Sequence, residues 1–125
     1  MRCLSLARAL LDLGAACGLI STPAAERVLK IFADPRIERL PAPEGPLHGL
    51  VDTARDLVRS WAADIAVVDH YRLAAAQERL LGVPVAAIDD VADRPHHCRL
   101  LIDPSLGREA QAYAAQQSLA APAAD

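Results

Sequence analysis

The stretch that decides the fold is DIAVVDHYRLAAAQERLLGVPVAAIDD, residues 64–90. It holds two short apolar runs that are typical of strands, with a segment of helical composition between them that ends at a Gly-Val-Pro turn. Strands separated by a helix of this length must run parallel, because tight turns cannot join parallel neighbours. The sequence therefore predicts the α/β class. The predicted order is strand 64–69, helix 73–81, strand 85–89, strand 99–103 and helix 108–119.

The first sixty residues show the same alternation. Apolar residues at helical spacing, Leu6, Leu10 and Leu13 among them, indicate that the chain opens with an amphipathic helix. The predicted elements are helix 2–13, strand 17–21, helix 23–33 with Thr22 as its cap, strand 37–40, a proline-rich loop at 41–46 and a helix from about Leu47 to Trp61.

Composition excludes several classes of protein. With 125 residues and 53% hydrophobic residues, one domain with a real core is expected over residues 1–119, followed by a fraying tail at 120–125. A net charge of −3 with scattered basic residues argues against nucleic acid as a partner. No apolar run is long enough to span a membrane and no signal peptide is evident, so a cytoplasmic location is expected. The three cysteines lack a CxxC spacing, which favours reduced thiols.

Three of the predicted strands are each followed by an aspartate: Asp69, Asp89 and Asp103. In an open parallel sheet, ligands bind beyond the carboxyl ends of the strands. The sequence therefore predicts that these aspartates line one crevice.

Asp69-His70-Tyr71 offers an acceptor, a group that titrates near neutrality and a phenol donor in one loop, which is typical of sugar binding. The alternative is that Asp69 only caps the following helix and Tyr71 only packs. Both interpretations stay open from the sequence.

The segment after the second of these strands carries several polar groups. Asp89 and Asp90 could act as acid and base, but adjacent residues point to opposite sides of a strand, which favours one of them as a turn cap. The run HHC at 96–98 suggests zinc, but consecutive residues cannot all face one ion and no second cluster is evident. We therefore expect no metal. Arg94 is expected to fix the loop against Asp90 or Asp93, with Cys98 packed as a small apolar residue.

Six short words of this chain, in this order, resemble the UDP-sugar hydrolases of pseudaminic acid biosynthesis. They are MRCLSLA at 1–7, VVDHY at 67–71, IDD at 88–90, ADRPHHC at 92–98, LID at 101–103 and LGR at 106–108.

The resemblance implies a Rossmann-like parallel sheet, the N-terminal half of the two-domain GT-B fold of glycosyltransferases. Members of that family hydrolyse UDP-2,4-diacetamido-2,4,6-trideoxy-β-L-altropyranose to UDP and the free sugar without a metal or other cofactor. Tyr71 matches the family's active-site tyrosine, and Arg2 matches the arginine of its opening motif. The expected site therefore has Tyr71 as its catalytic group and, as substrate-binding groups, Arg2, Asp69, His70, Asp89 and Asp90.

The chain also departs from the family's pattern. The family's catalytic base is a histidine in a glycine-rich loop before the segment that matches 1–3, and no histidine of this chain occupies that position. Ser105 stands where the family has Asn, and Arg99 where it commonly has Asp. We therefore expect an N-terminal-domain fragment that lacks the first central strand and the UDP-binding half, that is inactive as it stands, and that self-associates through open strand edges. The alternatives are a non-enzymatic sugar- or protein-binding module and a remnant of a decayed gene.

Overall fold

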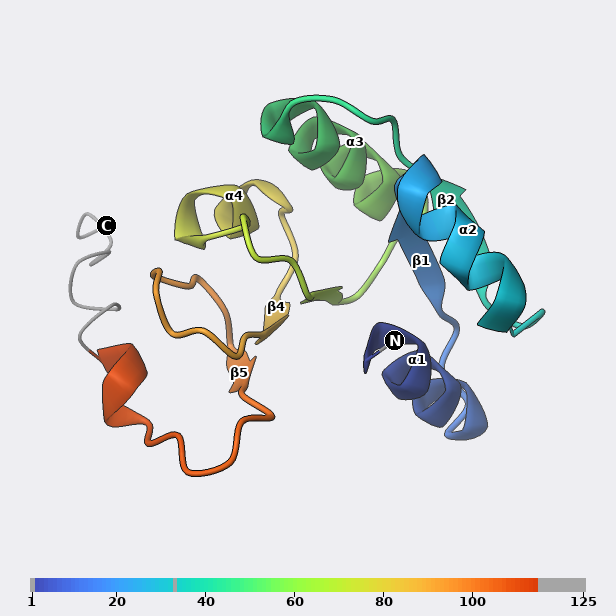
Figure 1. Cartoon of the computed structure of the whole chain (residues 1–125). Helices are drawn as coiled ribbons and strands as arrows, with labels where there is room; N and C mark the ends of the chain where they lie inside the picture. The colour runs from blue at the N-terminus through green and yellow to red at the C-terminus, as the bar shows by residue number, and fades with distance from the viewer. Residues whose placement is uncertain (1, 33, 115–125) are drawn as a thin grey trace. The chain divides into compact units, whose positions relative to one another are not determined.

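The computed structural model describes residues 2–32 and 34–114 (Figure 1). Helices and parallel strands alternate along these residues, which confirms the α/β class. The elements are α1 (Arg2–Asp12), β1 (Gly18–Ser21), α2 (Pro23–Phe32), β2 (Glu38–Pro41), α3 (Leu47–Ser60), β3 (Ala66–Val68), α4 (Ala75–Leu80), β4 (Val85–Ile88) and β5 (Leu100–Ile102). The chain divides into two compact units, Met1–Leu57 and Val58–Asp125, which are described separately below.

The first unit is built on a parallel pair of strands. β1 and β2 pair in register from Gly18 opposite Glu38 to Ser21 opposite Pro41, and α2 forms the crossover between them. Pro23 is the first residue of α2, where its missing N–H goes unused. The buried apolar residues of this unit are Leu4, Ile37, Ala42 and Val51.

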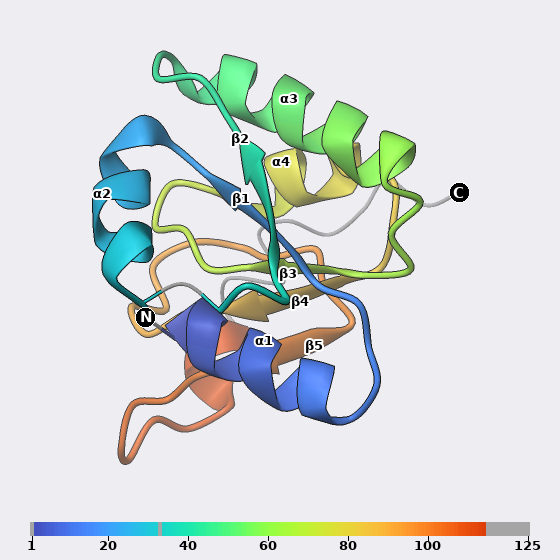
Figure 2. The ribbon, with the colours of Figure 1, turned by 90° about the vertical axis from the view of Figure 1, so that its right-hand side faces the viewer.

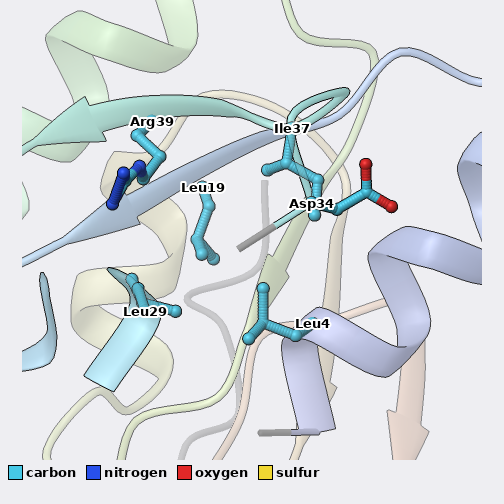
Figure 3. A pocket seen from close by; sticks show the side chains of 6 residues that line it. All are labelled: Leu4, Leu19, Leu29, Asp34, Ile37 and Arg39. Carbon is cyan, nitrogen blue, oxygen red and sulfur yellow. The ribbon is translucent and has the colours of Figure 1, made fainter. Parts of the chain in front are cut away.

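A small cavity lies within the first unit (Figure 3). Its volume is about 10 Å³, and its lining residues are Leu4, Leu19, Leu29, Asp34, Ile37 and Arg39. That volume is about the minimum for one water molecule, so this cavity is a packing defect of the core and not a ligand site.

The second unit is built on three parallel strands in the order β3-β4-β5, which lie side by side in Figure 2. Ala66 is opposite Val85 across the first pair, and Ala86 is opposite Leu100 across the second. The crossover from β3 to β4 contains α4, whereas the segment from β4 to β5 has no helix. Among the buried apolar residues of this unit are Val68, Ala75, Leu81, Val85, Ala87, Ile88 and Tyr113.

The order of elements agrees with the sequence prediction. The described strands form two small parallel sheets, β1-β2 and β3-β4-β5. Several bounds differ by one to three residues. Residues 111–114 are helical, while the rest of the helix predicted to reach Leu119, the tail at 120–125, Met1 and Ala33 lie outside the described residues. No helix within 2–32 and 34–114 is long and apolar enough to cross a membrane.

The start of α4 illustrates why bounds differ. The sequence predicts a helix from Leu73, but the structure begins it at Ala75, after an extended Ala74. The Gln77 side chain accepts the Ala74 N–H at 3.0 Å, and the Pro95 carbonyl accepts the Ala75 N–H at 2.9 Å. The N-cap position is thus occupied by Ala74 and not by Asp69, and two N–H groups at the start of the helix are satisfied by Gln77 and Pro95.

Candidate functional site

The carboxyl edge of the β3-β4-β5 sheet carries the three aspartates singled out from the sequence. Asp69, Asp89 and Asp103 each follow directly on the last residue of a strand, and the strands are parallel, so all three lie at the same edge. Their environments differ, however, and only part of this edge is open to a ligand.

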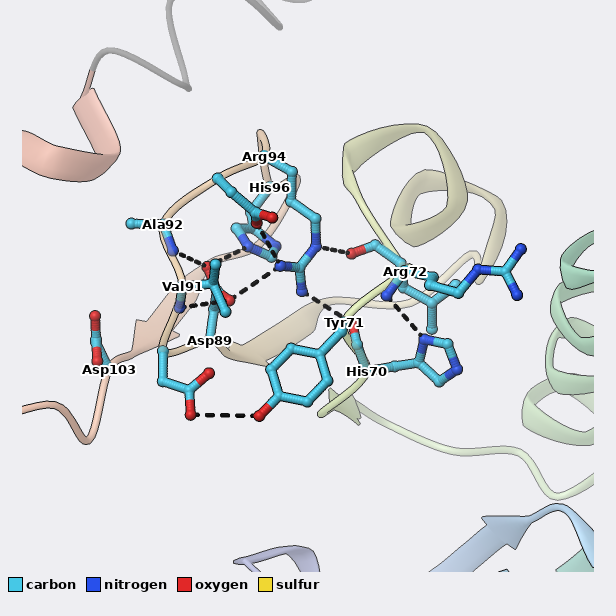
Figure 4. A network of polar contacts seen from close by, with 12 residues as sticks. His70, Tyr71, Arg72, Asp89, Val91, Ala92, Arg94, His96 and Asp103 are labelled. Atoms are coloured by element: carbon cyan, nitrogen blue, oxygen red, sulfur yellow. Dashed lines mark hydrogen bonds and ion pairs between the residues drawn. The ribbon is translucent and has the colours of Figure 1, made fainter. Parts of the chain in front are cut away.

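Asp89 is buried and its carboxylate is fully used (Figure 4). It accepts the backbone N–H groups of Val91 at 3.3 Å and Ala92 at 3.2 Å, which confirms the expectation that one of the two adjacent aspartates is a turn cap. It also accepts a bond from Arg94 at 3.0 Å and one from His96 at 3.2 Å. Burial raises the pKa of Asp89, but these bonds together hold it below its ordinary value. Asp89 is therefore an ionised structural group and not a substrate ligand.

Arg94 joins the loop after β3 to the loop after β4. Its guanidinium donates to the carbonyls of Leu73 at 2.7 Å and His70 at 2.9 Å (Figure 4). It also donates to Asp89 and Asp93, each at 3.0 Å, so the expected partner Asp93 is confirmed and Asp89 replaces Asp90 as the other carboxylate. The planar guanidinium allows this because its donors point in several fixed directions.

His96 lies between two buried carboxylates, an arrangement that the sequence analysis did not predict. Its Nδ1 is 2.7 Å from Glu78 Oε1 and its Nε2 is 3.2 Å from Asp89 Oδ2. The other oxygen of Glu78 accepts the backbone N–H of His97 at 2.6 Å. A signal for this site was present in α4, since Glu78 lies three residues from both Ala75 and Leu81 and so shares their buried face.

Asp103 is also engaged within the protein. The Tyr113 hydroxyl is 2.7 Å from Asp103 Oδ2 and 3.0 Å from the Asp89 carbonyl oxygen, and Arg108 Nε is 3.1 Å from Asp103 Oδ2. The bond from Tyr113 and the hydroxyl and N–H of Ser105 lower the pKa of Asp103 to about 2. Asp103 thus binds the end of β5 to the helical turn at 111–114.

Tyr71 is exposed at this edge, and the half-buried Asp90 lies beside it. The Tyr71 side chain is 61% exposed, so the interpretation in which it only packs is wrong. Its hydroxyl lies 3.5 Å from Asp90 Oδ2 (Figure 4). The Asp90 backbone is fixed from the opposite side, because Arg108 donates to its carbonyl at 2.8 Å. A hydroxyl and a carboxylate at this separation can bind the hydroxyl or amide groups of a sugar.

The other predicted site residues are placed as follows. His70 Nδ1 accepts the N–H of Arg72 at 3.1 Å, and burial together with the charges of Arg72 and Arg94 lowers its pKa, so the ring is neutral at pH 7. Asp69 is half-buried at the end of β3. Arg2 lies in the first turn of α1 and belongs to the first unit.

Two further observations concern possible ligand sites in the described residues. Among residues 2–32 and 34–114 no three His, Cys, Asp or Glu side chains are placed to hold a metal ion, and the HHC run at 96–98 is divided between a buried His96, an exposed His97 and a half-buried Cys98. A shallow pocket of about 390 Å³ lies in the first unit near the ends of β1 and β2, lined by Ser21, Pro23, Glu26, Arg27, Lys30, Pro41 and Ala42.

Fold and site together define an α/β protein of short parallel strands, with a buried charge network and an exposed tyrosine at the carboxyl edge of one sheet. No family model matches the chain, and a search of the curated proteins finds no significant match.

Proposed function

We propose that this chain is N-terminal-domain sequence of a UDP-sugar hydrolase like those of pseudaminic acid biosynthesis, and that Tyr71 and Asp90 contact the sugar. One observation carries the proposal. The segments at 67–71 and 88–98 both resemble that family, and the structure brings a residue of each together, since the Tyr71 hydroxyl of the first contacts the Asp90 carboxylate of the second. The GT-B architecture and a cytoplasmic location belong to the same proposal. The parallel order β3-β4-β5 supports it, because ligands bind at this edge of such sheets.

The described side chains of the second unit are better suited to binding a sugar than to catalysing its hydrolysis. His96, Asp89 and Asp103 are each held by two or more protein groups, and the Nδ1 lone pair of His70 is already occupied. A positioned general base contributes about 10²- to 10⁴-fold to a rate. We therefore expect these 125 residues alone to bind the nucleotide sugar without detectable release of UDP.

Titration of the isotopically labelled chain with UDP-2,4-diacetamido-2,4,6-trideoxy-β-L-altropyranose tests the proposal. We expect chemical-shift changes centred on Tyr71 and Asp90, and a tenfold or smaller loss of affinity in Tyr71→Phe, because one net hydrogen bond contributes about 0.5–1.5 kcal/mol. UDP alone and the free sugar, titrated in parallel, show which half of the ligand is bound.

Tyr113→Phe is the matched control, since it removes the other tyrosine hydroxyl of the chain, which lies on Asp103 and not on the exposed edge. It should lower stability and leave affinity unchanged. Shift changes confined to other residues would contradict sugar binding at Tyr71. Sustained UDP release by the purified chain would contradict the expected inactivity.

A non-enzymatic binding module is the second candidate. It is favoured by the same internal pairing of Asp89, Asp103 and His96, which leaves little acid-base chemistry available to a substrate. Binding of the free sugar as tightly as the UDP-linked sugar would support this module over a hydrolase-derived domain.

A further inference from the structure

Both ring nitrogens of His96 face carboxylate oxygens. Glu78 lies 2.7 Å from Nδ1 and Asp89 lies 3.2 Å from Nε2, and the three side chains are 0–1% exposed. A neutral imidazole has one N–H and one lone pair, so one of these contacts would set a lone pair against an anion. The geometry is satisfied when both nitrogens carry a proton.

The charges of the groups around His96 also favour a protonated imidazole. The two buried carboxylates, Glu78 and Asp89, face two cationic groups, Arg94 and a protonated His96, and Arg94 also pairs with the exposed Asp93. Removing the proton of His96 leaves one uncompensated negative charge in a region closed to water, which is strongly unfavourable.

The charged and titratable groups that act on the ring are Glu78 of α4, Asp89 at the end of β4, Arg94 of the following segment, and Tyr113, whose ring centroid is 6.4 Å from that of His96. Asp93 pairs with Arg94, and Cys98 of the same segment lies within the electrostatic influence of Glu78. The hydrogen bond from Glu78 raises the pKa of His96, against the opposing effect of burial, which agrees with the geometry.

These contacts are part of a larger set that holds residues 89–99, in which Arg94 also binds the carbonyls of His70 and Leu73. Residues 89–99 join two parallel strands without a helix, and their attachments to α4 are the Glu78 contacts with His96 and His97 and the Pro95 carbonyl on Ala75. Within the segment Ala92 has a φ of 56°, a left-handed conformation that a residue with a Cβ disfavours. Its N–H is bound by Asp89, so the network also stabilises that strained turn.

We infer that His96 is a pH-dependent latch, whose protonated ring holds residues 89–99 against α4 and keeps Asp90 beside Tyr71, and whose deprotonation releases the segment. The latch is a property of the second unit and does not depend on which ligand, if any, binds at Tyr71.

The direction of the pH effect follows from the raised pKa of His96. A pKa that is raised in the folded chain gives stabilisation that is complete below the ordinary value of 6.5 and is lost as the pH rises through the raised value. For each unit by which closing raises the pKa of His96, the equilibrium constant for closing is about tenfold larger with His96 protonated than with His96 neutral. The contribution of His96 to closing is therefore complete below pH 6.5 and weakens as the pH rises above that value.

Side-chain nitrogen NMR of the full chain, combined with amide hydrogen exchange across the same pH range, tests the latch. We expect the signals of His96 to show both nitrogens protonated at neutral pH. Protection of the amides in 91–98, corrected for the intrinsic pH dependence of exchange, should then fall as His96 loses its proton, by about tenfold for each pH unit between the ordinary and the raised pKa. A single neutral tautomer of His96 at neutral pH, or protection that is unchanged through its titration, would overturn the inference.

Two variants and a matched control sharpen the result. Glu78→Gln should move the titration of His96 to lower pH, and His96→Gln should abolish the pH dependence of protection. His97→Gln is the control, because His97 is the exposed neighbour in the chain. If His97→Gln removed the transition as completely as His96→Gln, the latch would be refuted. If His96→Gln failed to fold, the titration of the unmodified chain would still decide.

Discussion

At the scale of single residues, Arg94 does more than any other side chain to connect the candidate site. Its guanidinium binds two backbone carbonyls from the loop after β3 and two carboxylates from the loop after β4, and the side chain is 13% exposed. Lysine carries the same charge but lacks the planar, divergent donors. The number of directed bonds, and not the charge alone, sets the value of this residue.

We expect Arg94→Lys to lower the free energy of unfolding by about 1–3 kcal/mol, since at least one buried carbonyl loses its charged donor. Urea denaturation followed by circular dichroism measures the loss. Arg99→Lys is the matched control at an exposed position in the same segment. Equal stability of the two variants would show that the contacts of Arg94 contribute nothing beyond its charge.

At the scale of elements, sequence patterns correctly predicted those features that depend on neighbouring residues in the chain. The alternation of helices and strands followed from periodicity, and the start of α2 followed from Pro23. The start of α4 was missed because one of its caps is the carbonyl of Pro95, 20 residues beyond Ala75. The strand pairs inside each sheet, β1-β2 and β3-β4-β5, join strands that follow one another along the chain, as the predicted order of elements implies.

The candidate site was predicted only where its contacts are local in the sequence. The turn cap at Asp89 is local and was expected, whereas the contact between Glu78 and His96 joins residues 18 apart and was not. Glu78 looks like a solvent-facing charge in a helical segment until its spacing from Ala75 and Leu81 is considered.

Among residues 2–32 and 34–114, the order β3-β4-β5 leaves β5 with one unpaired edge, and its apolar residues Leu100 and Ile102 are 56% and 36% exposed. Such edges pair with other chains. We expect concentration-dependent self-association, measured by sedimentation velocity, that Leu100→Lys reduces. Leu106→Lys is the control, because Leu106 is fully exposed outside any strand. A chain that stays monomeric at every concentration, or equal effects of the two variants, would contradict association through β5.

At the scale of the whole molecule, each unit holds a carboxylate whose pKa is strongly lowered. Bonds from Arg36 lower the pKa of Asp34 to about 2, and the bond from Tyr113 does the same for Asp103. Lowered values stabilise the fold above the ordinary pKa of 3.8, and that stabilisation is lost as the pH falls toward 2. The two histidines act in opposite directions below pH 6.5, because the raised pKa of His96 adds stability there and the lowered pKa of His70 removes it.

We expect the urea midpoint of the chain to fall as the pH is lowered from 3.8 to 2. Asp103→Asn should lower the midpoint at neutral pH and reduce its further fall in acid, because the titrating group is gone. A midpoint that does not change down to pH 2 would contradict the lowered pKa values.

The buried network of Glu78, Asp89, Arg94 and His96 also has a consequence for heat. Withdrawing ions from water becomes less unfavourable as temperature rises, while the apolar contribution per unit of buried area levels off. The alanines Ala75 and Ala87 are among the buried residues beside the network and offer little apolar area. Warming therefore weakens the attachment of residues 89–99 less than it weakens an attachment made of apolar contacts, and the segment should keep its conformation until the surrounding sheet melts.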